Sequence, residues 1–364
     1  MLILLGVALS LYAIFMICLL AGWKRVFAER PPEASFEEFI TVIVPVRNEE
    51  KGIRSLLNDL TRQQYGSFEI VIVNDHSEDQ TESIIHDFGS SRIKCIQNEG
   101  AGKKHALTTG IAVASGAIIA TTDADCHVPP GWLASLNRFF SDDSVKMLIG
   151  PVSIEGQGDL FSHMQQLEFA SLIGTAAATS AFNRPVMCNG ANLAFRKEIF
   201  ESVSGYEGNF HISSGDDEFL LRKILDRWPE GVRFVTDNAS VIRTLPQRSV
   251  DDFIHQRLRW AGKWRHNSSY FTLLVAMIVL AIQVCSIIFY FNFFRTMEFK
   301  WLVFAMIRFG SEAYILRKFC YFLRIRWRWP AFVILFLIYP FYVTYVAISS
   351  NFLSYSWKGR MSQS

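Results

Sequence analysis

The sequence predicts an α/β fold: a central domain around a mostly parallel sheet, with membrane-spanning helices at both ends of the chain. Three observations lead to this fold class. Apolar strands alternate with polar helical segments in the middle of the chain, two of these strands end in acidic residues, and long uncharged apolar runs occupy the two ends. Alternation of strands and helices favours parallel pairing and a sheet covered on both faces.

The first element is an almost uncharged run, residues 1–23, whose length matches a membrane span. Lys24, Arg25 and Arg30 follow it. A cleaved signal peptide carries its positive charge before the apolar run, and that alternative fits this order less well. We therefore expect an uncleaved anchor, with the following domain in the cytoplasm by the positive-inside rule.

The central domain is expected over residues 36–265, where the composition becomes that of a water-soluble α/β domain. Its first strand is short and β-branched and stops at Pro45. Apolar strands are expected to open the stretches 39–50, 68–81, 92–99 and 116–125. Polar helical segments are expected over 49–64, 81–89 and 100–115.

Acidic residues stand where the second and fourth strands end. Asp75 follows one strand, and Asp123 and Asp125 follow the other in the run TTDAD. An acidic surface turn is one interpretation of this run. However, ligands of parallel sheets bind at the carboxyl ends of the strands, and magnesium or manganese is commonly held by one or two carboxylates together with substrate phosphates. The pattern therefore predicts a nucleotide and metal site at this edge.

The C-terminal membrane region, residues 270–350, is expected to hold two or three spans. The runs 270–294 and 330–350 are uncharged and long enough to cross a bilayer. The segment 299–309 between them is apolar but short, and charged residues interrupt its continuation, so it is either a third span or a re-entrant or interfacial helix. The basic and aromatic stretch 317–329 suits the cytoplasmic headgroup zone and favours a span.

Composition excludes several classes of partner. The formal charge of the 364-residue chain is only +2, which gives no support for a nucleic-acid partner. The six cysteines are scattered and form no CxxC pair, so we expect free thiols in a reducing compartment. The eight histidines show no metal-ligand spacing.

Seven short motifs carry a resemblance to a known family. In chain order they are IVPVRNEE, IVNDHSEDQT, GAGKKHAL, TTDADC, CNGANLAFRK, GDDEFL and QRLRW. Over residues 40–263 the chain resembles the family 2 glycosyltransferases, which have the GT-A fold. Its layout is similar to the membrane-bound branch that includes ceramide glucosyltransferases and the cellulose, chitin and hyaluronan synthases.

The resemblance implies a donor site in the first half of the domain. Pro45 and Glu49 match the loop near the base and ribose, and Asp75 matches the acid that binds the uracil ring. Either Lys103 or Lys104 matches the basic residue beside the nucleotide, with a solvated helix start as the alternative.

The D-x-D pair completes this donor site. Asp123 is expected to touch the ribose or the metal, and Asp125 to bind the metal directly. The implied cofactor is Mg²⁺ or Mn²⁺, which would neutralise the leaving diphosphate.

The acceptor side is implied by the two following motifs. Gly190 and Asn192 match the acceptor or sugar contact, with a turn entering a strand as the alternative. Asp217 matches the general base and Asp216 the acid that precedes it. An acid-rich helix N-terminus is the alternative for these two, and both interpretations can hold together.

The last motif, QRLRW, is expected on an amphipathic helix near the membrane. Arg259 is expected to pair with the diphosphate, because its planar fork suits phosphate oxygens. Gln256 and Trp260 complete the motif, and Trp260 would stack on the acceptor sugar. A basic interfacial helix that holds the domain on anionic lipid is the alternative.

These expectations add up to a membrane-bound inverting glycosyltransferase that moves a sugar from a UDP-sugar to a lipid or a growing glycan of the cell envelope. We expect an integral protein of the inner membrane with its catalytic domain in the cytoplasm and no nucleic-acid partner. The alternatives are a processive polysaccharide synthase, a nucleotidyltransferase and a non-catalytic membrane scaffold.

Overall fold

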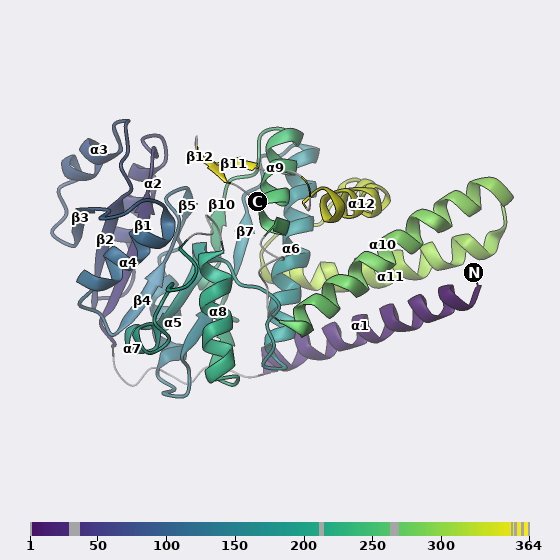
Figure 1. The fold of residues 1–364 in the computed structure, drawn as a ribbon, viewed down its shortest axis with the longest axis horizontal. Helices are drawn as coiled ribbons and strands as arrows, with labels where there is room; N and C mark the ends of the chain where they lie inside the picture. The colour runs from purple at the N-terminus through teal and green to yellow at the C-terminus, as the bar shows by residue number, and fades with distance from the viewer. Residues whose placement is uncertain are drawn as a thin grey trace. The chain divides into compact units, whose positions relative to one another are not determined.

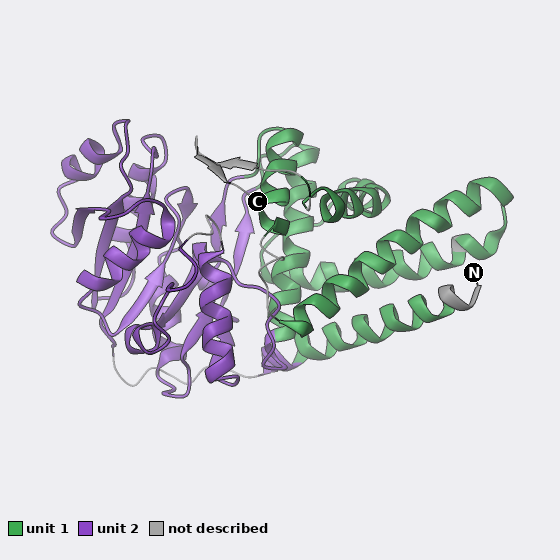
Figure 2. Cartoon of the chain, viewed as in Figure 1, with its two compact units in different colours: residues 1–24, 156–179, 246–364 green, residues 25–155, 180–245 purple. Residues whose placement is uncertain are grey.

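The structure is a computed structural model that describes residues 2–28, 37–210, 215–262, 269–350, 352, 355–357 and 360–362. The chain divides into two compact units (Figure 2). The sheet unit comprises residues 25–155 and 180–245, and the helical unit comprises residues 1–24, 156–179 and 246–364. The expected limits of the catalytic domain, residues 36 and 265, lie outside the described residues.

The sheet unit is built on a seven-stranded sheet of order β3-β2-β1-β4-β8-β6-β9. β1 is parallel to β2 and β4, β2 to β3, and β6 to β9, whereas β8 runs antiparallel to both β4 and β6. The mostly parallel sheet expected from the sequence is therefore confirmed. The strands are β1 (Ile40–Val46), β2 (Phe68–Asn74), β3 (Ile93–Gln97), β4 (Ile118–Thr121), β6 (Met147–Ile149), β8 (Leu193–Arg196) and β9 (Val232–Phe234).

A small second sheet in the same unit has the order β5-β10-β7. Its strands are β5 (Cys126–His127), β7 (Val152–Ile154) and β10 (Ile242–Thr244). β5 begins directly after the run TTDAD, so the acidic turn lies between β4 of the main sheet and β5 of the small one.

The central strands are β-branched and buried along nearly their whole length. β1 reads ITVIVPV and β2 reads FEIVIVN, which is the pattern of parallel strands covered on both faces. β1 does not stop at Pro45 as expected but continues to Val46, with Pro45 opposite Val73. A proline fits here because it lacks only the N–H donor and retains its carbonyl acceptor.

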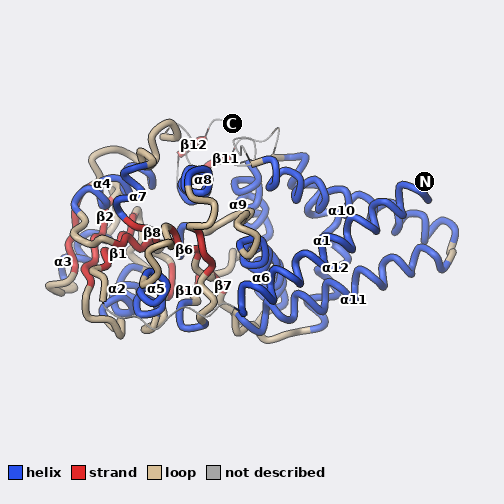
Figure 3. The backbone as a smooth tube through the Cα atoms, turned by 90° about the horizontal axis from the view of Figure 1, so that it is seen from below, coloured by secondary structure: helices blue, strands red, loops and turns tan. Residues whose placement is uncertain are grey.

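Helices cover both faces of this sheet, with α4 and α7 on one side and α2 and α5 on the other (Figure 3). α2 buries Ile53, Leu56, Leu57 and Leu60, a spacing that places one apolar stripe on the sheet. The helices of the unit are α2 (Ile53–Thr61), α3 (Thr81–Asp87), α4 (Lys103–Val113), α5 (Trp132–Phe140), α7 (Lys197–Ser202), α8 (Asp216–Arg227) and the short 3₁₀ turns η1 (Gly190–Asn192) and η2 (Asn238–Ser240).

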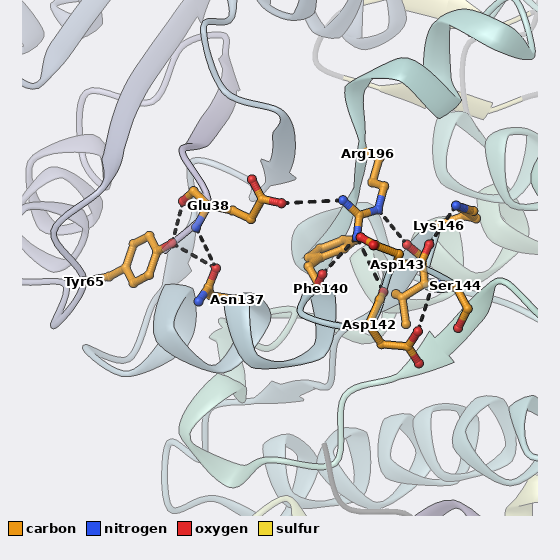
Figure 4. Close-up of polar contacts among 10 residues, drawn as sticks. Glu38, Tyr65, Asn137, Phe140, Asp142, Asp143, Ser144, Lys146 and Arg196 are labelled. Carbon is orange, nitrogen blue, oxygen red and sulfur yellow. Dashed lines mark hydrogen bonds and ion pairs between the residues drawn. The ribbon is translucent and has the colours of Figure 1, made fainter. Parts of the chain in front are cut away.

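A polar cluster closes the amino edge of the sheet, where β1 begins and β8 ends (Figure 4). The guanidinium of Arg196 donates to the carbonyls of Val145 and Phe140 at 3.0 and 2.9 Å and pairs with Glu38 at 3.7 Å. The backbone N–H of Glu38 donates to Asn137 Oδ1 at 3.0 Å. Because buried charges are stable only when paired and hydrogen-bonded, this cluster fixes the edge opposite to the acidic strand ends.

The helical unit holds α1 (Leu2–Ala28), most of α6 (Leu160–Ser180), α9 (Val250–Gly262), α10 (Tyr270–Thr296), α11 (Phe299–Phe322), α12 (Trp329–Ser349) and the hairpin of β11 (Tyr355–Trp357) and β12 (Arg360–Ser362). α10 and α11 pack side by side (Figure 1). Among the described residues three helical segments are long and apolar enough to cross a membrane, 6–28, 270–296 and 329–349.

The segment expected to be short, 299–309, is instead the start of one continuous helix. α11 runs from Phe299 to Phe322 without a break. The charges at Arg308 and Glu312 do not interrupt it, because their side chains are hydrogen-bonded to each other inside the unit. The first part of the basic stretch 317–329 belongs to the same helix.

Candidate functional site

The acidic strand ends meet at the carboxyl edge of the sheet. β2 and β4 flank β1 and run parallel to it, so their carboxyl ends lie at the same edge. Asp75 follows β2 directly, and Asp123 follows β4 by two residues. The antiparallel β8 brings its amino end to this edge, because Leu193 pairs with Thr121. Gly190, just before β8, therefore lies beside the end of β4.

Asp75 is buried, at 4% exposure, and holds the loop that leads into α4. Its carboxylate accepts hydrogen bonds from the backbone N–H of Gly102 at 2.9 Å and from Asn98 Nδ2 at 2.7 Å. Gly102 has φ of +93°, a conformation that strains any residue with a side chain. Asp75 thus fixes the position of the start of α4, whose first residue is Lys103.

Lys103 lies among the acidic residues of the edge. Its Nζ is 2.5 Å from Asp123 Oδ1 and 3.6 Å from Asp216 Oδ2. Burial by itself would lower the pKa of Lys103, but the carboxylates of Asp123 and Asp216 outweigh it and raise that pKa above its ordinary value. Lys104 turns away and donates to the carbonyl of Asn209 at 2.7 Å. Of the two lysines considered, Lys103 is the one at the acidic edge.

The expected base, Asp217, is held at the start of α8. Its Oδ2 accepts from the backbone N–H of Gly190 at 3.1 Å, and its Oδ1 accepts from the N–H of Glu218 at 2.8 Å. Asp216, Asp217 and Glu218 fill the first helical turn, where the helix dipole stabilises negative charge. Asp217 is partly exposed, whereas Asp216 is buried against Lys103. The helix-start interpretation and a site at Asp217 are compatible.

Gly190 is closely surrounded by these same groups. A Cβ at this position would lie 3.1 Å from Asp216 Oδ2 and 3.2 Å from Lys103 Nζ. The carbonyl of Gly190 accepts from Thr121 Oγ1 at 2.8 Å, which ties it to the end of β4. A side chain at this position would therefore press on the Asp216 carboxylate and the Lys103 ammonium, which would have to shift by a few tenths of an ångström.

Asn192 has a different environment from Gly190. It is fully buried, its Oδ1 accepts from Trp132 Nε1 at 2.9 Å, and its Nδ2 donates to the carbonyls of Pro151 and Ser240 at 2.8 Å each. These bonds use both amide donors and the carbonyl oxygen. The side chain joins three segments of the sheet unit, and the turn entering a strand that we considered for this motif is seen as η1 followed by β8.

Two further expected donor residues lie on and just after β1. Pro45 is inside the strand, and Glu49 lies in the turn that leads to α2. The backbone N–H of Glu49 donates to Thr81 Oγ1 at 2.7 Å, and its carbonyl accepts from the N–H of Ile53 at 3.0 Å. The loop that follows β1 is therefore anchored to the start of α3.

Gln256, Arg259 and Trp260 lie on α9, which belongs to the helical unit. Within that unit the buried arginine of the motif is Arg257, whose Nε is 3.0 Å from Glu168 Oε1. Gln256 Oε1 accepts from the same guanidinium, and the ring of Trp260 lies 4.3 Å from it. The roles expected for Arg259 and Trp260 toward the donor and acceptor stay predictions.

Several residues of the acidic edge and of the cluster around α9 were not identified from the sequence. Thr121 anchors Gly190, and Tyr206 is a buried phenol whose pKa is raised well above its usual value by burial and by the charges of Asp216 and Asp217. Glu168 pairs with Arg257 in the helical unit. Glu168 could have been suspected, because it is a lone acid in the otherwise apolar part of α6.

Carboxylates gather at the acidic edge, and these are the donor groups that a divalent cation requires. The ammonium of Lys103 already lies within 4 Å of two carboxylates, Asp123 and Asp216, so this edge concentrates negative charge around a cation. Asp125 is exposed in the turn after Asp123, and carboxylate oxygens are the ligands that Mg²⁺ and Mn²⁺ prefer. Among the described residues no three His, Cys, Asp or Glu side chains are placed to hold a metal.

Comparison with known proteins places this geometry in context. Residues 41–204 match the family model described as Glycosyl transferase family 2. The chain is 29% identical over 201 residues to glycosyltransferase AglE of Haloferax volcanii, covering 52% of this chain and 62% of AglE. It is 25% identical over 248 residues to the poly-beta-1,6-N-acetyl-D-glucosamine synthase of Staphylococcus aureus, covering 65% of this chain and 58% of the synthase. It thus spans less than two thirds of the length of these relatives.

Among solved structures, the mannosyltransferase PcManGT from Pyrobaculum calidifontis, in complex with GDP-Man and Mn²⁺, is similar to this chain with a TM-score of 0.53 and 20% identity. The similarity covers 96% of this chain and 99% of PcManGT, and it shows the fold.

The mixed sheet and this likeness show the GT-A fold, and the matching sequences give the class of the domain as a glycosyltransferase. More narrowly, the chain carries a glycosyltransferase family 2 domain. The family and the fold class predicted from the sequence are confirmed.

Proposed function

We propose that the protein transfers a sugar from a UDP-sugar to a lipid or glycan acceptor, with inversion at the anomeric carbon. The observation that carries this proposal is the meeting of Lys103, Asp123, Asp216 and Asp217 around Gly190 at the carboxyl edge of the sheet. Nucleotide ligands of such sheets bind at this edge.

In this proposal Asp217 is the general base. Its carboxylate takes the proton of the acceptor hydroxyl while the hydroxyl oxygen bonds to the anomeric carbon of the sugar. The bond from that carbon to the diphosphate breaks, and UDP leaves with the electron pair. The backbone N–H groups of Gly190 and Glu218 hold the two oxygens of Asp217, so the base is oriented before the acceptor arrives.

Lys103 and the two aspartates of the D-x-D pair would serve the leaving group. Lys103 supplies a positive charge where the diphosphate would lie, and Asp123 holds that charge in place at 2.5 Å. A divalent metal held by Asp123 and Asp125 would supply Lewis-acid stabilisation of the diphosphate. Support for a divalent metal comes from the similar solved structure, which is described with GDP-Man and Mn²⁺.

The membrane layout supports a membrane-bound acceptor. Three helical segments are long and apolar enough to span a bilayer. Lys24 and Arg25 lie at the end of the first, which by the positive-inside rule supports a cytoplasmic sheet unit. An inner-membrane location is part of the proposal.

A second candidate within the same class is a processive synthase that extends one glycan many times. The similarity to a poly-beta-1,6-N-acetyl-D-glucosamine synthase favours it. A single-transfer enzyme and a processive one differ in product length. The family match argues against a nucleotidyltransferase, which would release pyrophosphate.

The test is a nucleotide-release assay on purified protein in nanodiscs, with UDP- and GDP-sugars, lipid extract and manganese. We expect UDP release with one donor, and no release from the Asp217→Asn variant. Release of GDP instead of UDP would show that the donor is a GDP-sugar, and the role of Asp217 as general base would stand. Unchanged turnover in Asp217→Asn would refute the mechanism, and a ladder of long products would select the processive candidate.

A further inference from the structure

α11 has the length of a membrane span but not the composition of one. Its 24 residues correspond to about 36 Å of helix at 1.5 Å per residue, against a hydrocarbon core of about 30 Å. It is not among the three segments that qualify by length and composition, and it carries Arg308 and Glu312 near its middle. The location of these two charges decides whether the helix can lie in lipid.

Both charges point into the helical unit. Arg308 is only 1% exposed, and its Nε lies 2.7 Å from Glu312 Oε1, one turn further along the helix. A second guanidinium nitrogen donates to Ser286 Oγ on α10, and the ring of Phe336 on α12 lies 4.9 Å from the guanidinium carbon. The charged guanidinium of Arg308 is therefore not exposed on the surface of the helical unit.

Glu312 links the same cluster to the N-terminal helix. Its Oε1 accepts from the hydroxyl of Tyr12 on α1 at 2.9 Å. Further along, Trp23 of α1 packs against Phe319 and Phe322 of α11, with ring centroids 4.7 and 5.9 Å apart. The ion pair is therefore surrounded by side chains from α1, α10 and α12, all of which belong to the helical unit (Figure 2).

The opposite face of α11 is apolar and exposed. Val303, Met306, Ile307 and Tyr314 are 38%, 53%, 53% and 55% exposed, a spacing that forms one stripe along the helix. The inward face, by contrast, includes residues below 6% exposure, namely Trp301, Phe304, Arg308, Ile315 and Phe319. Apolar side chains outside and a paired charge inside is the arrangement that lets ionisable residues lie within a bilayer.

The helices that qualify as spans also expose large apolar side chains. α1 exposes Val7, Ile14 and Ile17, and α10 exposes Met277 and Phe291, each by more than half. A water-facing stripe beside these surfaces would leave a large unpartnered apolar patch. The occupant that fits all of them together is the acyl region of the lipid bilayer.

We propose that α11 is a fourth membrane-spanning helix, packed against the other three through Arg308 and Glu312 and facing lipid acyl chains through Val303, Met306, Ile307 and Tyr314. Lys300 and Arg317 then lie on opposite sides of the membrane.

Cysteine labelling of the full chain tests this topology. Single cysteines would be introduced at Lys300, Ile307 and Arg317, in a background whose native cysteines are replaced and which retains nucleotide binding. All three side chains are exposed, so the substitutions leave the core intact. The probe is a membrane-impermeant maleimide added to sealed vesicles of known orientation, and Lys51→Cys in the sheet unit reports the side of the catalytic domain.

We expect Lys300→Cys and Arg317→Cys to be labelled from opposite sides, and Ile307→Cys to react at least roughly tenfold more slowly than either, because lipid shields it. Labelling of both ends from one side, or fast labelling of Ile307→Cys in vesicles, would overturn the proposal. If Ile307→Cys is protected but forms a disulfide with a second copy of the chain, the stripe is a protein interface and its assignment to lipid is wrong.

Discussion

Lys103 Nζ lies 2.5 Å from Asp123 Oδ1, so the first aspartate of the D-x-D pair is already paired with a side-chain cation. The same ammonium is 3.6 Å from Asp216, the neighbour of the proposed base. One lysine thus joins the donor side and the acceptor side of the acidic edge.

Replacing Lys103 should change metal and nucleotide binding in opposite directions. In Lys103→Met we expect Mn²⁺ to bind more tightly in the absence of nucleotide, by roughly tenfold or ~1.4 kcal/mol, because a competing cation is removed. We expect UDP to bind more weakly, because the diphosphate loses a positive charge. Electron paramagnetic resonance of free Mn²⁺ and calorimetry with UDP would measure the two. Exposed Lys51→Met is the control, and a parallel loss of both affinities would contradict the competition.

The charge of Lys103 should not limit activity near neutral pH. Its pKa is raised in the folded protein, so its favourable pairing is complete below the ordinary lysine pKa of about 10.4 and is lost only as pH rises through the higher folded value. The ratio of wild-type to Lys103→Met turnover should therefore be constant between about pH 6 and pH 9. A ratio that falls steadily over that range would show that the lysine is losing its proton there.

Asp217→Asn should abolish turnover and spare donor binding. We expect a loss of about 10²–10⁴-fold in kcat, the usual contribution of a general base. The amide nearly preserves the shape of the carboxylate, so Mn²⁺-dependent UDP binding should change little. Glu218→Gln, in the same helical turn, is the matched control and should retain most activity. Equal losses in the two variants would point to damage to α8.

Gly190→Ala should slow the reaction through crowding. The added methyl would lie 3.1 Å from Asp216 Oδ2 and 3.2 Å from Lys103 Nζ, tighter than ordinary contacts, so these groups must shift by a few tenths of an ångström. We expect a fall of roughly 10–100-fold in kcat, since catalysis is sensitive to small misplacement. Gly52→Ala is the control, because its Cβ would meet Ala124 O at an ordinary 3.5 Å.

Asn192→Ala separates a structural role from an acceptor contact. Three buried partners would lose their hydrogen bonds, and we expect a loss of roughly 2–4 kcal/mol in the free energy of unfolding. Chemical unfolding in detergent would measure it, with exposed Asn58→Ala as the control. Unchanged stability together with a raised KM for the acceptor would instead support the contact expected from the sequence.

The alternation of elements and the acidic strand ends were predictable because both are local patterns. A β-branched run that ends in Asp75 or Asp123 predicts, without reference to the rest of the chain, both a strand and the sheet edge at which the acid lies. The insertion of β8 between β4 and β6 was not predictable, because antiparallel pairing of residues 193–196 with residues 118–121 is a long-range contact. For the same reason the tie between Thr121 and Gly190 has no signature in the sequence.

The sequence alone also could not decide which of two neighbouring residues faces a site. Lys103 and Lys104 are about 100° apart around α4, and only the packing decides which one faces the acids. In QRLRW the motif draws attention to Arg259, whereas the buried ion pair belongs to Arg257. The sequence favours a span for 299–309, but the continuation of α11 to Phe322 was not predictable, because hydropathy cannot tell whether Arg308 points inward or outward.

The hydrogen bond from Gly102 to Asp75 has a mechanical consequence for selectivity. Asp75 holds Gly102 at 2.9 Å, and the next residue along the chain is Lys103. A ligand that displaces Asp75 would therefore shift the start of α4 and, with it, the ammonium of Lys103. If Asp75 contacts the nucleobase, a nucleotide with the wrong base would displace the ammonium of Lys103. The enzyme would then discriminate between nucleotides more through the turnover number than through the binding affinity.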